Sequence, residues 1–480
     1  MKSIQHIFRL LLIITLAAGC KKGLDLPPAS ELSDAFLQTK KGATALLNGV
    51  YADGQFIADP GVNRIYVEES TTDVLVNYRG ALNVDVLPFQ SFNWLPTTGF
   101  LSQFYTKNYT TIRDANILLV NIPANTELSA AEKTLMTAEA KFLRALAYYY
   151  LYGWFGPVPL NTTPFTSPND NFSVAKSDEA GLLSFIETEL TTAAADLPAS
   201  IAVTGKATRG AALGVLAKYY LQTKNWTKAA ATAKQVMDLN LYGLQSDYTA
   251  LFAKANKGNT EMIFVYPSIS KIGFGNVWTA NALPPQYPTT VFNTATQVCM
   301  PLAFYRTFAA TDKRRNLILT SYTSTTGALI DLTTGVEYQN PRSLKYPLDP
   351  VADERHHGND FPLIRYADIL LSRAEALVQA GGTATQEALD LLNQIRVRAG
   401  LAALTPTDVP DKAAFITALV RERGWEFYSE GKRREDLLRN GLFIQNALNR
   451  SLPAKDYQTR FPFPQSEVDA NKGLVQNTGY

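Results

Sequence analysis

Three glutamates at helical spacing are the residues of this chain that most resemble catalytic carboxylates. Glu422, Glu426 and Glu430 lie in "RERGWEFYSEGKRREDLL" at positions i, i+4 and i+8, so a helix places them on one face. Paired carboxylates are the groups that hydrolyse glycosidic bonds. The same segment is rich in arginine, and this alternation of charge is typical of ion pairs between helices. We therefore predict a structural role for the segment. The arginines are Arg421, Arg423, Arg433 and Arg434.

The chain has only three histidines, which restricts acid–base and metal chemistry. His6 lies in the N-terminal segment, and His356 and His357 are adjacent in a polar stretch with Asp353, Glu354 and Asp360. These side chains form a possible metal site, but adjacent histidines in a loop are more often solvated. The sequence has neither a G-x-S-x-G elbow nor a phosphate-binding P-loop. We predict no metal, no cofactor and no enzymatic activity.

Aromatic side chains on two polar segments are the candidates for ligand binding. Sugar rings pack their C–H faces on flat aromatic rings, while amide and guanidinium groups hydrogen-bond the hydroxyls. We predict irregular loops for "NYRGALNVDVLPFQSFNWLPTTG" and "KIGFGNVWTANALPPQYPTT". For each tryptophan the alternative is ordinary packing in the core. The candidates are Tyr78, Arg79, Asn93 and Trp94 in the first segment and Asn276, Trp278, Asn281 and Tyr287 in the second.

A further aromatic cluster lies in "YYYLYGWF" at the end of a predicted helix. Because these residues follow helical spacing, we predict core or helix-packing roles rather than a sugar platform. The cluster consists of Tyr148, Tyr149, Tyr150, Tyr152, Trp154 and Phe155.

Cys20 follows a short apolar run near the start of the chain. Residues 10–18 are apolar apart from Thr15 and follow a basic start, which is the pattern of a secretory signal and too short for a membrane span. "LAAGC" resembles the lipobox of bacterial lipoproteins. That resemblance implies that residues 1–19 are a signal peptide, that Cys20 is lipidated, and that residues 20–30 tether the protein to a membrane. Cys299 then remains alone, so we expect no disulfide.

The composition is that of a folded protein with balanced charge. The chain has 480 residues, of which 46% are hydrophobic, and 45 basic residues face 43 acidic ones for a net charge of +2. This balance gives no support for a nucleic-acid partner.

Helical periodicity dominates the chain. We predict a helix from about residue 32, one over about 101–120, and one that follows the capping-box pair Ser129 and Glu132. Two helical hairpins follow: one turns near Lys224, and the other spans 362–401 and turns at Gly381 and Gly382. Residues 243–361 are rich in Pro, Gly, Thr and Asn, which favours loops and short strands such as "TEMIFVYPS". The predicted fold is mainly α, an irregular array of tetratricopeptide-like hairpins with long loops and small β elements. Regions 31–242 and 243–480 are expected to pack as one unit.

Three segments resemble the hallmarks of the SusD/RagB family of outer-membrane lipoproteins. They are "EAKFLRALAYYYLYGWFGPVPL", "FPLIRYADILLSRAEAL" with "LNQIRVRAGL", and "RERGWEFYSEGKRREDLLRNGLF"; the ending "FPFPQSEVDANKGLVQNTGY" is also similar. The resemblance implies a Bacteroidetes-type, non-enzymatic binding subunit at the outer face of the outer membrane. It implies as partners a SusC-like TonB-dependent barrel and a nutrient ligand, usually a glycan.

Two other functions stay open at this point. Some members of the family carry oligopeptides, which would be held in a groove by main-chain hydrogen bonds. A hydrolase would need two carboxylates facing each other across an open cleft.

Overall fold

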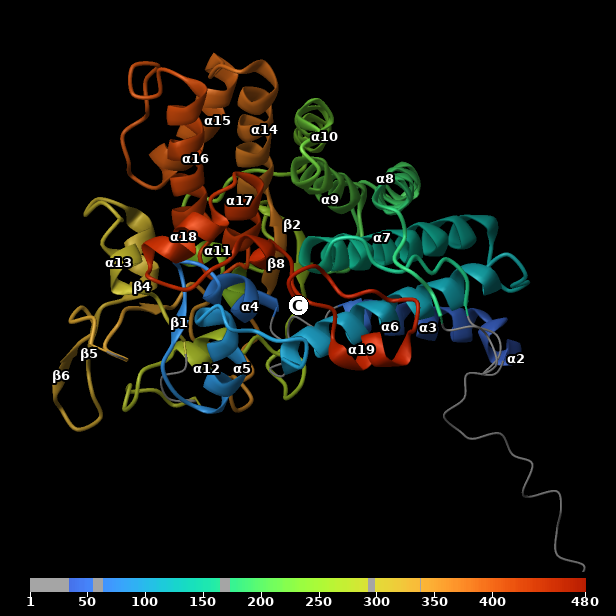
Figure 1. Ribbon diagram of the computed structural model, residues 1–480, viewed down its shortest axis with the longest axis horizontal. Coiled ribbons are helices and arrows are strands. Elements are labelled where there is room, and N and C mark those ends of the chain that lie inside the picture. The colour runs from blue at the N-terminus through green and yellow to red at the C-terminus, as the bar shows by residue number, and fades with distance from the viewer. Residues whose placement is uncertain (1–33, 55–63, 165–172, 292–297, 337) are drawn as a thin grey trace, which may run out of the picture.

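The computed structural model describes residues 34–54, 64–164, 173–291, 298–336 and 338–480, and these are predominantly helical (Figure 1). The predicted signal peptide, Cys20 and the tether lie outside the described residues. No helix within the described ranges has the length and apolar character needed to cross a membrane.

The long helices pack one after another into a continuous array. Each packs against the next from α3 through α6, α7, α8, α9 and α10 to α14, which packs against both α15 and α16. In Figure 1 this array runs from the lower right to the top of the molecule. The predicted mainly helical array of hairpins is confirmed. The bounds are α3 (Lys40–Gly54), α6 (Gly99–Asn121), α7 (Ala130–Phe155), α8 (Glu179–Asp196), α9 (Arg209–Gln222), α10 (Trp226–Asp238), α14 (Tyr366–Gly381), α15 (Gln386–Arg398) and α16 (Lys412–Phe427).

Local signals at the helix ends match the predicted boundaries. Ser129 and Glu132 form the predicted capping box ahead of α7. The first hairpin turns at Lys224, which has a φ of 58°, and the second at Gly382, which has a φ of 76°. The second hairpin begins later than predicted, because Leu363 lies in a strand ahead of α14.

Short strands join distant parts of the chain in antiparallel pairs. The pairs are β1–β3, β2–β8, β4–β7 and β5–β6. Strand β2 is the predicted strand in "TEMIFVYPS", and the segment 243–361 has the predicted mixture of loops and small strands. The bounds are β1 (Val76–Asn77), β2 (Met262–Tyr266), β3 (Val298–Cys299), β4 (Ile318–Leu319), β5 (Ser321–Thr323), β6 (Leu329–Asp331), β7 (Arg342–Ser343) and β8 (Phe361–Arg365).

Shorter helices cover the ends of the array and the loop region. One of them, α5, lies in the middle of the first segment that was predicted to be an irregular loop, and Pro88 lies inside it. Val86 and Phe89 of α5 are buried, so tertiary packing holds a helix that local sequence does not favour. The bounds are α2 (Asp34–Leu37), α4 (Arg64–Ser70), α5 (Ala81–Gln90), α11 (Tyr248–Leu251), α12 (Trp278–Ala282), α13 (Leu302–Tyr305), α17 (Arg433–Arg439), α18 (Phe443–Asn449) and α19 (Gln465–Ala470).

The three glutamates of α16 and its C-terminal end form a buried network of ion pairs. Glu422 contacts Arg314 at 2.7 Å and Arg396 at 2.9 Å. Glu426 contacts Arg365 at 2.7 Å and Arg398 at 2.6 Å, and Glu430 contacts Arg365 and Lys345. The predicted structural role is confirmed. The partners are not the neighbouring arginines: Arg314 and Lys345 lie in the segment 243–361, Arg365 ends β8, and Arg396 and Arg398 lie in α15. The network therefore ties the loop region to the helical array.

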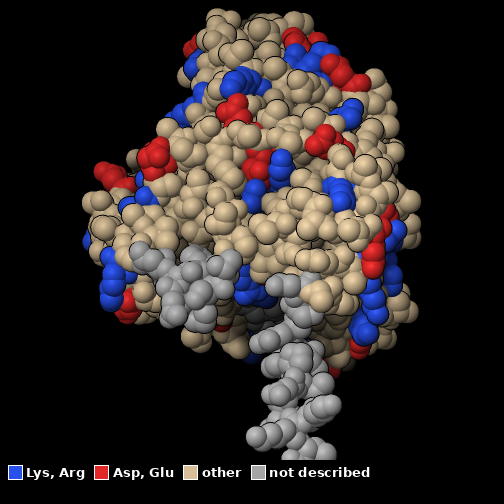
Figure 2. All heavy atoms as spheres, turned by 90° about the vertical axis from the view of Figure 1, so that its right-hand side faces the viewer, with Lys and Arg blue, Asp and Glu red and all other residues tan. Residues whose placement is uncertain are grey.

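The surface charge is mixed on the face shown in Figure 2, which is the right-hand side of Figure 1. Basic and acidic side chains are interspersed there among uncharged ones. This distribution agrees with the small net charge of +2.

Candidate functional site

Pairing of β1 with β3 positions the first candidate residues. Val76 pairs with Cys299 and Asn77 with Val298, so the chain that follows β1 lies beside the loop region. Tyr78 and Arg79 come directly after this pairing and are exposed, Tyr78 to 41%. Their position therefore matches the prediction of accessible side chains on a loop.

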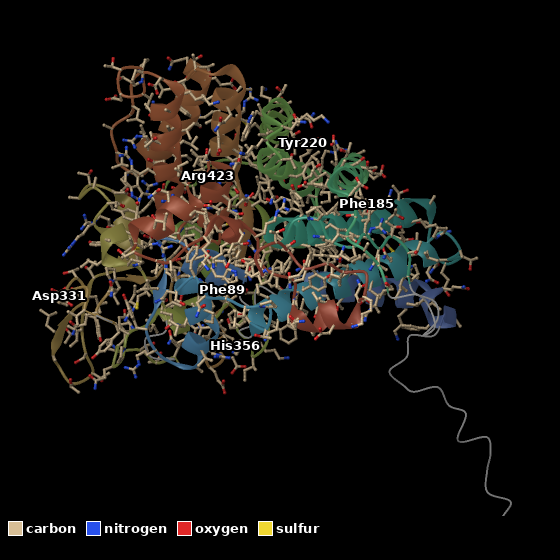
Figure 3. The ribbon with its side chains drawn as sticks, in the orientation of Figure 1. Phe89, Phe185, Tyr220, Asp331, His356 and Arg423 are labelled. Atoms are coloured by element: carbon tan, nitrogen blue, oxygen red, sulfur yellow. The ribbon has the colours of Figure 1, made fainter. Side chains whose placement is uncertain are left out.

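Trp94 is a core residue, which corrects the prediction of a sugar platform. Its side chain packs against Phe89, Phe92 and Phe461, with ring centroids 4.9–6.0 Å apart. The Trp94 indole N–H donates to the Tyr480 hydroxyl at 2.8 Å. Neighbouring Asn93 is exposed, while Phe89 lies inside the molecule (Figure 3). With its ring faces covered by other rings, Trp94 has no face to offer a sugar.

Trp278 and the two asparagines near it are also buried, for related reasons. Trp278 lies in α12 against Tyr66, and its indole N–H donates to the Ser343 carbonyl at 3.3 Å. The Asn281 amide donates to the Tyr66 hydroxyl, and Asn276 accepts from the Trp278 backbone N–H. All three side chains therefore stabilise α12 and its packing. The prediction that they contact a ligand is wrong.

A set of exposed and partly buried tyrosines lies where the predicted loops meet the loop region. We call Tyr78, Arg79, Tyr287, Tyr322 and Tyr338 the tyrosine surface. The Arg79 guanidinium carbon lies 5.8 Å from the centroid of the Tyr338 ring, and Tyr338 is 38% exposed. Tyr287 and Tyr322 are partly buried, with ring centroids 5.6 Å apart. Figure 1 shows the β5–β6 hairpin, which carries Tyr322, at the left edge of the molecule, and Asp331 marks the end of β6 in Figure 3.

Arg342 stabilises the backbone of the tyrosine surface from the interior of the protein. It is fully buried in β7; its guanidinium contacts the Cys299 sulfur and donates to the Tyr338 carbonyl at 2.5 Å. Burial lowers the pKa of Arg342, and it raises the pKa of both Tyr78 and Tyr322. These phenols are therefore neutral at ordinary pH, and the Tyr322 hydroxyl donates to the Pro285 carbonyl at 2.7 Å.

Sequence reasoning missed Tyr322 and Tyr338. The signal available was a lone aromatic in each of two polar stretches, "TSYTST" and "GVEYQN". Nothing local links these stretches to Tyr78, because strand pairing across the loop region brings them together.

The glutamate network cannot serve as a hydrolytic site in this structure. Burial opposes ionisation of Glu426, but Arg398, Arg365 and Arg314 together hold its pKa well below the usual range. Glu422, Glu426 and Glu430 are all at most 1% exposed. The network therefore offers no carboxylate to a substrate.

The two adjacent histidines are buried, contrary to the prediction of a solvated loop. Backbone N–H and C=O groups of His357 and Asn276 bond each other, and the Asp349 N–H donates to His357 Nδ1. Gly275 makes this approach possible, since a Cβ there would lie 2.5 Å from the Cβ of His356. Within the described ranges, no group of three His, Cys, Asp or Glu side chains converges as metal ligands.

Comparisons with known proteins identify the family of this helical scaffold. Residues 304–459 match the model described as "SusD family", and residues 23–221 match the model described as "Starch-binding associating with outer membrane". The chain therefore belongs to the SusD family of starch- and glycan-binding proteins associated with the outer membrane.

Individual relatives span almost the whole chain. The starch-binding protein SusD of Bacteroides thetaiotaomicron is 25% identical, and the similarity covers 100% of this chain and 99% of the relative. A SusD superfamily protein from Parabacteroides distasonis superposes with a TM-score of 0.81 at 26% identity, covering 92% of this chain and 99% of the other. A laminarin-binding SusD-like protein superposes with a TM-score of 0.78 at 25% identity, covering 92% and 100%.

Proposed function

We propose that this protein is a non-enzymatic lipoprotein that captures oligosaccharides at the outer face of the outer membrane. In this proposal Cys20 carries the lipid anchor, and a SusC-like TonB-dependent barrel takes the captured glycan across the membrane. Relatives named as starch-binding and laminarin-binding support a glycan as the ligand.

The tyrosine surface is the observation that carries the proposal. It combines rings that are accessible from solvent with a guanidinium group beside one of them. A sugar ring stacks on such a face through its C–H groups, while Arg79 and the neutral phenols hydrogen-bond its hydroxyls. The arrangement is an open surface, which suits a polymer that continues beyond the binding residues.

Binding without hydrolysis fits the placement of the carboxylates. The glutamates at helical spacing are held in buried ion pairs with arginines. A glycosidase requires two carboxyl groups on either side of the scissile bond. We therefore propose that this surface binds glycans and does not hydrolyse them.

The test is a binding screen of residues 21–480 against polysaccharides and oligopeptides. Native gels cast with amylopectin or laminarin measure retardation by the glycans, and calorimetry measures binding of a mixed tripeptide set. We expect retardation by at least one polysaccharide and no release of reducing sugar. Binding of peptides with no retardation by any glycan would replace the glycan proposal with a peptide-binding one.

The anchor has its own test in cells. A Cys20→Ala variant should move from the membrane fraction to the soluble fraction and lose labelling by a palmitate analogue. Continued labelling of the Cys20→Ala variant by the palmitate analogue would contradict lipidation at Cys20.

A further inference from the structure

A pocket of about 230 Å³ lies at the C-terminal end of α7 and shares no residue with the tyrosine surface. Helices α4, α9 and α17 and the chain at residues 459–460 form its other walls. We call it the Arg434 pocket. Its volume is below the roughly 300–1,000 Å³ of pockets for drug-sized ligands, so it suits one small ring or a short chain.

Arg434 is a buried cation with no carboxylate bonded to it in the described part of the chain. The side chain is 2% exposed, and its two terminal nitrogens donate only to the backbone carbonyls of Gly153 and Thr459. Its Nε has no hydrogen-bond partner. Burial lowers the pKa of Arg434 to about 10, so the guanidinium is still charged at neutral pH. A buried guanidinium of this kind gains most from a carboxylate that bonds it at two positions.

Arg64 adds to the same pocket a second guanidinium with an unpaired nitrogen. It is 7% exposed and pairs with Glu68 at 2.6 Å through one terminal nitrogen, while its Nε has no partner. Its guanidinium carbon lies 4.7 Å from the centroid of the Tyr150 ring.

The acidic side chains of the pocket are already engaged. Glu68 also accepts from the Trp154 indole N–H at 3.0 Å, and Glu435 accepts from Lys218 at 3.0 Å and from the Tyr149 hydroxyl at 2.6 Å. At the rim, exposed Lys224 adds positive charge, and exposed Arg460 pairs with Glu179 at 3.4 Å. The pocket therefore offers positive charge to a ligand and no free carboxylate.

The aromatic cluster that was predicted to be core supplies an apolar wall. Tyr149 and Trp154 are buried as predicted, whereas Tyr150 and Tyr152 are only partly buried and line the pocket. Rings beside a cationic centre accommodate the apolar face of a ligand whose charged end meets Arg434.

We infer that the Arg434 pocket binds a small carboxylate attached to a ring or short chain. Two sources present this chemistry: a uronic acid sugar and the C-terminal residue of a peptide. The inference does not depend on glycan binding at the tyrosine surface.

Titration calorimetry with the folded mature protein tests the inference with matched acidic and neutral probes. The probes are glucuronate against glucose, and the dipeptide Gly-Tyr against its C-terminal amide. We expect at least one acid to bind about tenfold or more tightly than its neutral partner. The acid that binds identifies the source. Equal binding of acid and neutral probe, or no binding of either acid at about 20 mM, overturns the inference.

Variants place the binding in the pocket. Arg434→Lys keeps the charge but cannot form a bidentate pair with a carboxylate, so we expect the affinity for the acid to fall about tenfold. Lys224→Gln lies at the exposed rim, so it should fold normally and weaken binding about threefold. Lys41→Gln removes an exposed lysine on α3 and should leave affinity unchanged. If Arg434→Lys does not fold, the comparison of Lys224→Gln with Lys41→Gln shows whether the acid binds in the Arg434 pocket.

An NMR readout separates this site from the tyrosine surface. The chain has five tryptophans, so the indole N–H of Trp154 is readily assigned with a Trp154→Phe sample. The acid should shift this signal in wild type and equally in Tyr338→Ala. Loss of acid binding in Tyr338→Ala, with Lys224→Gln unaffected, would place the acid on the tyrosine surface and overturn the inference.

Discussion

Arg365 shows how strongly single side chains of the buried network determine stability. It is fully buried and contacts Glu261, Glu426 and Glu430 at 2.7–2.9 Å. Arg365→Leu leaves these carboxylates short of a cation, so the free energy of unfolding should fall by about 3–5 kcal/mol. Urea denaturation measures the loss.

The exposed pair of Arg113 with Asp114 is the matched control for Arg365. The Arg113 side chain is 58% exposed, so Arg113→Gln should cost less than about 1 kcal/mol. Equal losses in the two variants would show that the buried network contributes no more than a surface ion pair.

His357 makes stability depend on pH below neutrality. Burial lowers the pKa of the His357 imidazole from 6.5 to about 4, although the negative charge of Asp349 acts to raise it. Between pH 6.5 and 4 the unfolded chain takes up a proton that the folded chain does not. This contribution therefore lowers the free energy of unfolding as pH falls, by about 2 kcal/mol from pH 7 to pH 5.

A His357→Asn variant isolates that contribution. Asparagine keeps an acceptor for the Asp349 N–H but does not titrate, so its stability should fall less than that of wild type over the same pH range. Urea denaturation at pH 7 and pH 5 provides the comparison. Identical pH dependence in the two proteins would rule out a neutral buried His357.

At the scale of elements, the α14–α15 turn tests the conformational role of glycine. Gly382 has a φ of 76°, and Gly381 is the last residue of α14; a Cβ at either position meets no atom within 4 Å. Gly382→Ala should therefore cost about 1 kcal/mol through backbone strain alone. Gly381→Ala should be neutral or slightly stabilising. Thermal denaturation compares the two variants, and equal melting temperatures would contradict a requirement for glycine at position 382.

Elements with strong local signals were predictable from the sequence, and those held by distant contacts were not. Helix α7 has a capping box, and the second hairpin turns at Gly382, a residue suited to positive φ, so their positions followed from local chemistry. Helix α5 contains Pro88, and packing of Val86 and Phe89 rather than propensity decides its structure. Trp94 was misjudged for the same reason, because its partner Tyr480 is 386 residues away.

At the scale of the whole molecule, one hydrophobic core joins the two predicted regions. The main buried cluster contains Leu37, Phe142, Phe264 and Leu474, which come from both sides of residue 243. We therefore predict one cooperative unfolding transition for residues 21–480. Far-UV circular dichroism and tryptophan fluorescence should give the same urea midpoint. Two separate midpoints would show that the regions unfold independently.

The most direct test of the proposed function is calorimetry of wild type and Tyr338→Ala with laminarin and amylopectin. Tyr338 stacks beside Arg79 on the tyrosine surface, so its loss should weaken binding of the recognised polysaccharide about tenfold. The control is Phe274→Ala, which removes an aromatic ring that is 60% exposed outside that surface, and its affinity should match wild type. Unchanged affinity in Tyr338→Ala, or no binding of either polysaccharide by wild type, would contradict glycan capture at this surface.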